Sequence, residues 1–254
     1  MTKNTKPAFI AVFSIFILPI ALLLINFFPS VWVFYASIAI LVAYFSFIAL
    51  RYNLDKTEVA LNFMTSWSFI VLMLLVENLI FRYVFIFFPL VVFFFIAYWS
   101  RPQISHGIHV KEKPLRRMMM MLYVFNTYAF FIGAYAWHLY FPNYSFVLIS
   151  SVSAVYSALA AYMIWSLYFK SEFKKLLIWS IIFATVIFEL MWVLVYLPFG
   201  YLAFGLLTVW IWYLLQLFVR FHLTKEDIVW EKQIGFLALN LILYIFVLFT
   251  IRWV

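Results

Sequence analysis

The chain alternates between long apolar stretches and short polar segments, and this pattern predicts helices that cross a membrane. A transmembrane helix needs about 20 mostly apolar residues, because it rises about 1.5 Å per residue through a hydrocarbon core of about 30 Å. Hydrophobicity is continuous within each stretch, without the alternation typical of a barrel strand. We therefore predict an all-α bundle of about nine spans, near residues 8–28, 31–50, 59–77, 83–99, 118–140, 146–169, 176–197, 201–219 and 234–251.

The basic residues fall almost entirely in every second polar segment, which predicts the topology of the chain. Lys and Arg concentrate in short loops on the cytoplasmic side of a membrane. Fifteen of the 17 basic residues lie in the N-terminal segment and the alternate loops that follow it, and only Arg82 and Arg252 lie elsewhere. We predict a cytoplasmic N-terminus and an external C-terminus, because one missed or additional span would destroy this separation.

The composition excludes a soluble domain and several kinds of chemistry. Hydrophobic residues make up 69% of the chain and charged residues 10%, against about 45–50% and about 25% in soluble domains. The net charge of +8 follows from the basic inner loops, so we expect these loops to face the anionic lipids of the inner leaflet, with no nucleic-acid partner. The absence of Cys excludes disulfides, thiolate metal sites and cysteine nucleophiles.

The sequence predicts a single integral membrane domain over residues 1–254, because no linker or soluble insertion interrupts the apolar stretches. Pro102, Gly107 and Pro114 argue against a long helix within 100–117. Similar turns, each with an aromatic or apolar residue before Pro, recur at residues 27–30, 140–143 and 196–199. They indicate either a duplicated helical hairpin or only the constant length of two membrane helices.

Glu189 is the only acidic residue deep inside a predicted span, which makes it the first candidate for function. A charge at the centre of a membrane helix costs at least about 2.5–3.5 kcal/mol, so we expect Glu189 to face the bundle interior. Thr185, Trp192 and Tyr196 share its helical face by their spacing. Two roles are open: an interhelical hydrogen bond that only holds the fold, or a site for a proton or a substrate.

The fifth span offers further members of this intramembrane polar site. Asn126 is predicted near mid-membrane and His138 near the outer boundary. An amide such as Asn126 is a suitable hydrogen-bond partner for a buried carboxyl. A histidine at the boundary is more often an interfacial residue than a proton relay, and the buried amides Gln216 and Asn240 more often join helices than bind a ligand.

The sixth span carries a packing signal. Small residues let helix backbones approach closely in lipid. We predict that this helix is central and contacts the fifth or the seventh span. The small residues form one stripe at helical spacing: Ser150, Ser153, Ala154, Ser157, Ala158 and Ala161.

Motifs for catalysis or cofactor binding are absent from the sequence. It contains no Walker loop, no Gly-x-Ser-x-Gly and no His-Glu-x-x-His. His106 and His109 are too few ligands for a metal site, and Glu77 and Arg82 predict a salt bridge at a short outer turn. We therefore predict no catalytic residue, no metal and no cofactor, which favours a protein that is not an enzyme.

Three segments carry a resemblance to known sequences: Ser157 to Trp165, the run Glu-Leu-Met-Trp at 189–192, and Leu197-Pro198. With them the chain resembles an uncharacterised family of small polytopic bacterial membrane proteins. The similarity covers mainly the C-terminal half. It implies a multi-pass protein of the bacterial cytoplasmic, or inner, membrane and implies no activity.

Three functions are compatible with these features. The first is an accessory or structural integral membrane protein that acts through partner contacts, favoured by scarce glycine, aromatic surfaces and little intramembrane charge. The second is a small transporter or lipid-handling protein with a site around Glu189, Asn126 and Thr185. The third is an intramembrane enzyme that acts on a lipid carrier, which would need acid–base groups at the membrane surface.

Overall fold

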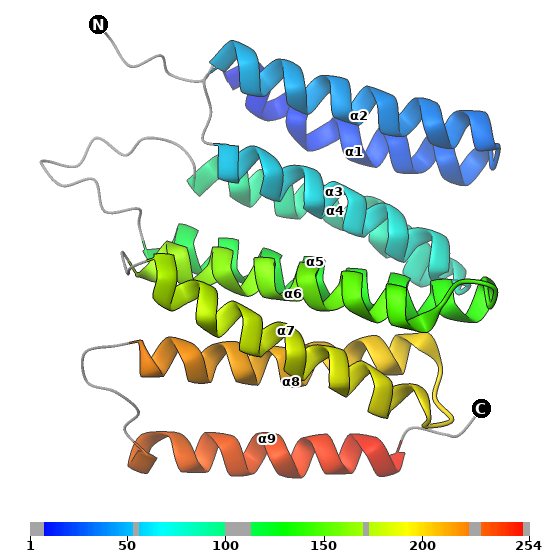
Figure 1. Ribbon diagram of the computed structural model, residues 1–254. Helices are drawn as coiled ribbons and strands as arrows, with labels where there is room; N and C mark the ends of the chain where they lie inside the picture. Colours follow the sequence, from blue (N-terminus) through cyan, green and yellow to red (C-terminus); the bar gives the residue numbers. More distant parts are fainter. Residues whose placement is uncertain (1–7, 53–55, 100–112, 170–172, 224–229, 251–254) are drawn as a thin grey trace, which may run out of the picture. The chain divides into compact units, whose positions relative to one another are not determined.

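The computed structural model describes residues 8–52, 56–99, 113–169, 173–223 and 230–250, and these residues contain helices and no strand. Each predicted span corresponds to one helix, so the all-α fold class is confirmed (Figure 1). The helices are α1 (Ala8–Phe27), α2 (Val31–Tyr52), α3 (Lys56–Leu75), α4 (Leu79–Trp99), α5 (Lys113–Tyr140), α6 (Phe146–Tyr168), α7 (Phe173–Val195), α8 (Tyr201–His222) and α9 (Trp230–Thr250).

Most of the described helices have the length and hydrophobicity of membrane spans. Six of them, α2 and α4 to α8, contain at least 18 residues of sufficiently apolar sequence. The described parts of α1, α3 and α9 contain shorter apolar stretches of 10–17 residues. The chain is therefore a helical, multi-pass membrane protein.

Two helices begin earlier than the apolar stretches predicted, because residues outside those stretches can start a helix. The expectation of a loop over 100–117 is wrong at its end, because α5 begins at Lys113 with Pro114 in its first turn. Proline is tolerated there, since the first turn has no intrahelical acceptor for its missing N–H. Likewise, α4 begins at Leu79 and not near 83, because the Asn78 Oδ1 atom accepts from the Ile80 amide at 2.9 Å.

The chain divides into two compact units, residues 1–126 and 127–254. The first unit contains α1 to α4 and the first half of α5, and the second contains the other half of α5 and α6 to α9. Because α5 is continuous across the boundary, the division does not test the predicted single domain, which stays a prediction.

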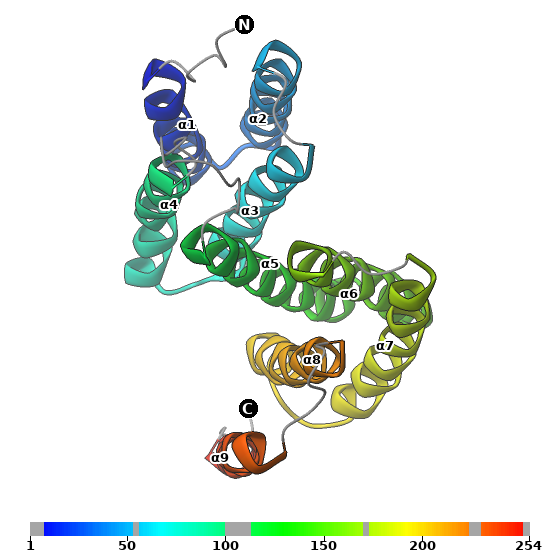
Figure 2. The ribbon, with the colours of Figure 1, turned by 90° about the vertical axis from the view of Figure 1, so that its left-hand side faces the viewer.

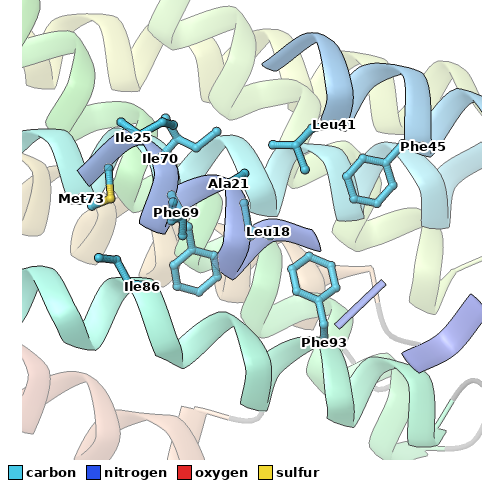
Figure 3. Close-up of a cluster of buried hydrophobic side chains, with 11 residues drawn as sticks. Leu18, Ala21, Ile25, Leu41, Phe45, Phe69, Ile70, Met73, Ile86 and Phe93 are labelled. Carbon is cyan, nitrogen blue, oxygen red and sulfur yellow. The ribbon is translucent and has the colours of Figure 1, made fainter. Parts of the chain in front are cut away.

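The first unit is a square of four helices around an apolar core. α1 contacts α2 and α4, and α3 contacts the same two helices, as seen on end in Figure 2. Figure 3 shows the core side chains between them, including Leu18 of α1, Phe69 of α3 and Ile86 of α4, all fully buried. The Phe69 ring lies 4.8 Å from that of Phe125, near the middle of α5, and 6.2 Å from that of Phe88.

The second unit is built around α6. This helix contacts α7 along most of its length and also contacts α8. The small residues of the sixth span predicted contact with the fifth or the seventh span, and α7 is the seventh. Rings join α5 to the same group, since Phe130 stacks on Tyr156 of α6 at 3.9 Å and Tyr135 lies 4.9 Å from Phe204 of α8.

Candidate functional site

Glu189 lies on the exposed side of α7, six residues before the last residue of the helix, Val195. The sequence had predicted an inward-facing carboxyl, and this orientation is wrong for the bundle that the chain itself forms. The opposite side of α7 takes the interior position, because it offers a continuous apolar stripe to α6 and α8. That stripe consists of Phe183, Ile187, Met191 and Leu194, all buried.

The surface around Glu189 is otherwise apolar. Ile182 lies about two turns before it and Val193 about one turn after it, with 46% and 63% of their surfaces exposed. Thr185 is also exposed, and its hydroxyl donates a hydrogen bond to the Ile181 carbonyl of its own helix at 3.2 Å. The face therefore presents one carboxyl and one hydroxyl within a stripe of aliphatic side chains.

Trp192 and His138 meet around a third ring, in the second unit. The Trp192 indole donates from Nε1 to the Ser150 hydroxyl of α6 at 3.2 Å, and its ring lies 5.1 Å from that of Phe146. The His138 ring of α5 lies 4.7 Å from the same Phe146 ring. Trp192 thus turns away from the exposed face toward α6, and its donor is used within the fold.

Asn126 joins helices of the first unit. It is buried, and its Nδ2 atom donates to the Thr65 hydroxyl of α3 at 3.1 Å. Thr65 in turn donates to the Leu61 carbonyl at 2.8 Å, while the Asn126 Oδ1 atom has no hydrogen-bond partner. Asn126 was predicted as a partner within the site around Glu189, whereas the hydrogen bond observed here joins α5 to a hydroxyl of α3.

All six small residues of the stripe predicted on α6 are buried: Ser150, Ser153, Ala154, Ser157, Ala158 and Ala161. Ser153 and Ser157 donate to carbonyls of their own helix at 2.8 Å, so that each hydroxyl is satisfied locally. With short side chains and no free hydroxyl hydrogen, this stripe leaves room for α7 to pack closely.

Sequence reasoning missed a set of polar contacts in the core of the second unit. The Trp212 Nε1 atom donates to the Ser157 carbonyl at 3.1 Å, and the Trp165 Nε1 atom donates to the Gln216 carbonyl at 3.3 Å. Tyr135 of α5 and Thr208 of α8 share a hydrogen bond of 3.0 Å. Deep tryptophans were the available signal, since a buried indole N–H needs an acceptor, but the acceptors are backbone carbonyls that no sequence pattern marks.

At the edge of the second unit, another indole N–H finds its hydrogen-bond acceptor on α9. The Trp210 indole donates to the Asn240 Oδ1 atom at 3.1 Å, and its ring lies 5.8 Å from that of Tyr244. A small apolar cavity of about 10 Å³ lies nearby between α8 and α9, lined by Leu217 and Phe236 among others. Its volume is that of one water molecule at most, so it does not accommodate an organic solute.

Ionic chemistry within the described residues is sparse. Arg82 donates from Nε and Nη2 to the Val76 carbonyl at 3.3 and 3.2 Å, so the predicted salt bridge with Glu77 is replaced by a cap on the end of α3. The described residues hold no group of three metal-ligating side chains. His106 and His109 lie outside the described residues.

Comparison with known proteins does not assign a family or a function to the chain. No family model matches the chain. No curated protein matches it, and no solved structure does. The resemblance to a bacterial family therefore stays a prediction.

Proposed function

We propose that the chain is a nine-span protein of a bacterial cytoplasmic membrane, with its N-terminus inside and its C-terminus outside. The described residues form nine helices at the predicted positions, and these helices and the one-sided distribution of Lys and Arg support this topology. Because the chain has no Cys, single cysteines at Ser30 or Asn143 are the only thiols in their variants. We expect an impermeant thiol reagent to label both from outside intact cells and not to label a cysteine at Ser105.

The function that this arrangement supports best is an accessory membrane protein that acts through lateral contacts with a partner. The observation that carries this proposal is the position of Glu189, which projects from the exposed face of α7 instead of lining an interior cavity. A transport site would present its ionisable group to a path inside the bundle. Several other polar side chains of the second unit, Trp192 and Trp212 among them, donate within the fold. The buried side-chain amide of Gln216 has no hydrogen-bond partner.

A further part of the proposal is contact with anionic lipids of the inner leaflet. Aromatic and basic side chains at the end of α6, the start of α7 and the end of α8 support it. The Arg220 guanidinium lies 5.0 Å from the Tyr168 ring, and the Trp179 ring lies 5.4 Å from that of His222. Aromatic and basic side chains gather in this way at the headgroup level of a membrane. The neighbouring basic loops add charge of the same sign.

Reconstitution separates lateral contact from transport. We expect vesicles that contain the purified protein to show no more ion flux, solute uptake or lipid scrambling than protein-free vesicles. Activity above that background that disappears in Glu189→Gln would overturn the proposal in favour of transport or lipid handling.

Photo-crosslinking in the native membrane tests the contact directly. A crosslinking amino acid at Val193, beside Glu189, should capture one discrete membrane protein. The matched control is Leu159, which is 57% exposed on α6 against 63% for Val193 and lies away from the α7 face. Equal capture of lipid or of mixed proteins at both positions would contradict a specific partner.

A further inference from the structure

The exposed face of α7 is centred on Glu189. Counting along the helix at 3.6 residues per turn, Ile182, Val193 and Ile178 all fall within about 40° of Glu189. Each of the three is at least 46% exposed, and the buried residues Ile187 and Met191 lie on the opposite side. The carboxyl is therefore at the middle of the face, as far as possible from the contacts of α7 with its own bundle.

Glu189 lies too deep in the predicted span for its carboxyl to reach water at the membrane interface. It precedes the end of α7 by six residues, or about 9 Å of helix. A long Lys or Arg side chain can reach the interface from such a depth, but the two-methylene stem of glutamate is much shorter. An ionisable side chain held in lipid in this way is costly unless a partner satisfies it.

The neighbouring side chains do not supply that partner. The Thr185 hydroxyl hydrogen is donated to Ile181, and the Trp192 indole hydrogen to Ser150. The nearest exposed basic residue on the described part of α7 is Lys175, which is 14 residues, or about 21 Å, away along the helix. The carboxyl thus lacks a donor on its own helix face.

We propose that this face docks a transmembrane helix of a partner protein that carries a lysine or arginine at the level of Glu189. The inference rests on the proposed function and names the chemistry of the partner. The aliphatic stripe from Ile178 to Val193, about 22 Å long, matches the contact length of one crossing helix, and a cation opposite the carboxyl neutralises it.

A second copy of this chain fits the face less well. The asymmetric distribution of Lys and Arg gives every copy the same orientation in the membrane. Two α7 faces that meet in parallel bring two Glu189 carboxyls to one level, where like charges oppose each other and neither face offers a cation.

The test uses synthetic transmembrane peptides in vesicles that contain the purified protein. One peptide is a leucine–alanine helix with a single lysine placed at the depth of Glu189, and a second has leucine at that position. A third carries the lysine about one and a half turns deeper. The protein carries an acceptor dye at Asn143→Cys, in the exposed α5–α6 turn, and energy transfer from a donor on the peptide reports association.

We expect the lysine peptide to associate about tenfold or more tightly than the leucine peptide, because an unpaired charge in lipid is penalised on both partners. Glu189→Gln and Glu189→Leu should reduce it to the level of the leucine peptide, and Glu189→Asp should retain a preference for lysine. The matched control is Val155→Gln on the exposed face of α6, where the wild-type residue is 58% exposed, and it should change nothing. The displaced lysine should lose the advantage.

Two results would overturn the proposal. One is equal association of the lysine and leucine peptides, or an advantage that survives Glu189→Leu in a protein of unchanged stability. The other is Glu189-dependent energy transfer between two labelled copies of the protein without peptide, which would assign the face to self-association. A discrete crosslink at Val193 together with either result leaves the proposed function standing, whereas transport activity removes the proposed function itself.

Discussion

Within each of the two units, the helices are held together by a different kind of contact. The core of the first contains a large apolar cluster, with aromatic rings of α4 and α5 packed against Phe69. Its buried hydroxyls on α3, those of Thr65, Ser66 and Ser68, donate to carbonyls of their own helix. The core of the second contains small residues, hydroxyls and indoles, and several of its hydrogen bonds join one helix to another. In lipid, where apolar burial between helices gains little, close packing and polar contacts are two independent ways to associate helices.

The close packing of the second unit is clearest between α5 and α8. A Cβ atom added to Gly205 would lie 3.0 Å from the Ile132 backbone nitrogen and 3.2 Å from its Cα atom. These are backbone atoms, so they cannot move aside as the end of a flexible side chain can. The first unit achieves its contacts with large side chains, whereas this contact depends on the absence of one.

The largest effect should come from deleting the central ring of the first unit. Phe69→Ala removes a fully buried side chain and leaves a cavity between α3, α4 and α5, and we expect a loss of about 3–5 kcal/mol in the free energy of unfolding. The matched control is Phe87→Ala, because Phe87 is 49% exposed on α4 and should lose much less. Unfolding in mixed detergent micelles measures both, and equal losses would show that the apolar core does not hold the first unit.

The close approach in the second unit predicts the next effect. Gly205→Ala forces α5 and α8 apart, and we expect a loss of about 1–3 kcal/mol in the free energy of unfolding, as for overpacked cores. Gly235→Ala is the control, since nothing lies within 4 Å of its added Cβ atom, and it should be neutral or slightly stabilising. If both variants unfold alike, the contact between α5 and α8 is looser than described.

A smaller effect should come from the hydrogen bond between Tyr135 and Thr208. A double-mutant cycle with Tyr135→Phe and Thr208→Val should give a coupling of about 0.6 kcal/mol and no more than about 1.7 kcal/mol, as for other interhelical bonds in membranes. Pairing Tyr135→Phe with Ser180→Ala is the control, because Ser180 bonds only to its own helix. Coupling in the control and none in the test pair would assign the stability to another interaction.

The smallest effect should come from the polar pair of the first unit. Asn126→Leu combined with Thr65→Val removes the hydrogen bond that Asn126 Nδ2 donates to the Thr65 hydroxyl, and it also removes the buried Asn126 Oδ1 atom, which has no partner. The free energy of unfolding should therefore change by less than about 1 kcal/mol. Thr65→Val alone, which leaves the buried amide without its acceptor, should be less stable than the double variant. The reverse order would show that this polar contact matters as much as those of the second unit.

The helices were predictable from the sequence because each carries its own signal. An apolar run of membrane length forms a helix whatever it later contacts, since lipid leaves no other way to satisfy its backbone. The ends were less predictable, as α5 shows, because a proline that breaks a helix interior is tolerated in the first turn. The interaction of α6 with α7 was predictable in kind, from small residues that favour a close neighbour.

The direction in which Glu189 projects was decided only by the tertiary structure. Its depth in α7 follows from the sequence, but a helix has two sides, and the side that turns inward is the one whose partners fit best. Here Phe183, Ile187 and Met191 fill the contact with α6 and α8, which leaves the carboxyl outside. Sequence fixes what a membrane helix is made of and how deep each residue lies. Packing between helices decides which residues remain for a partner, because that choice depends on surfaces contributed by distant parts of the chain.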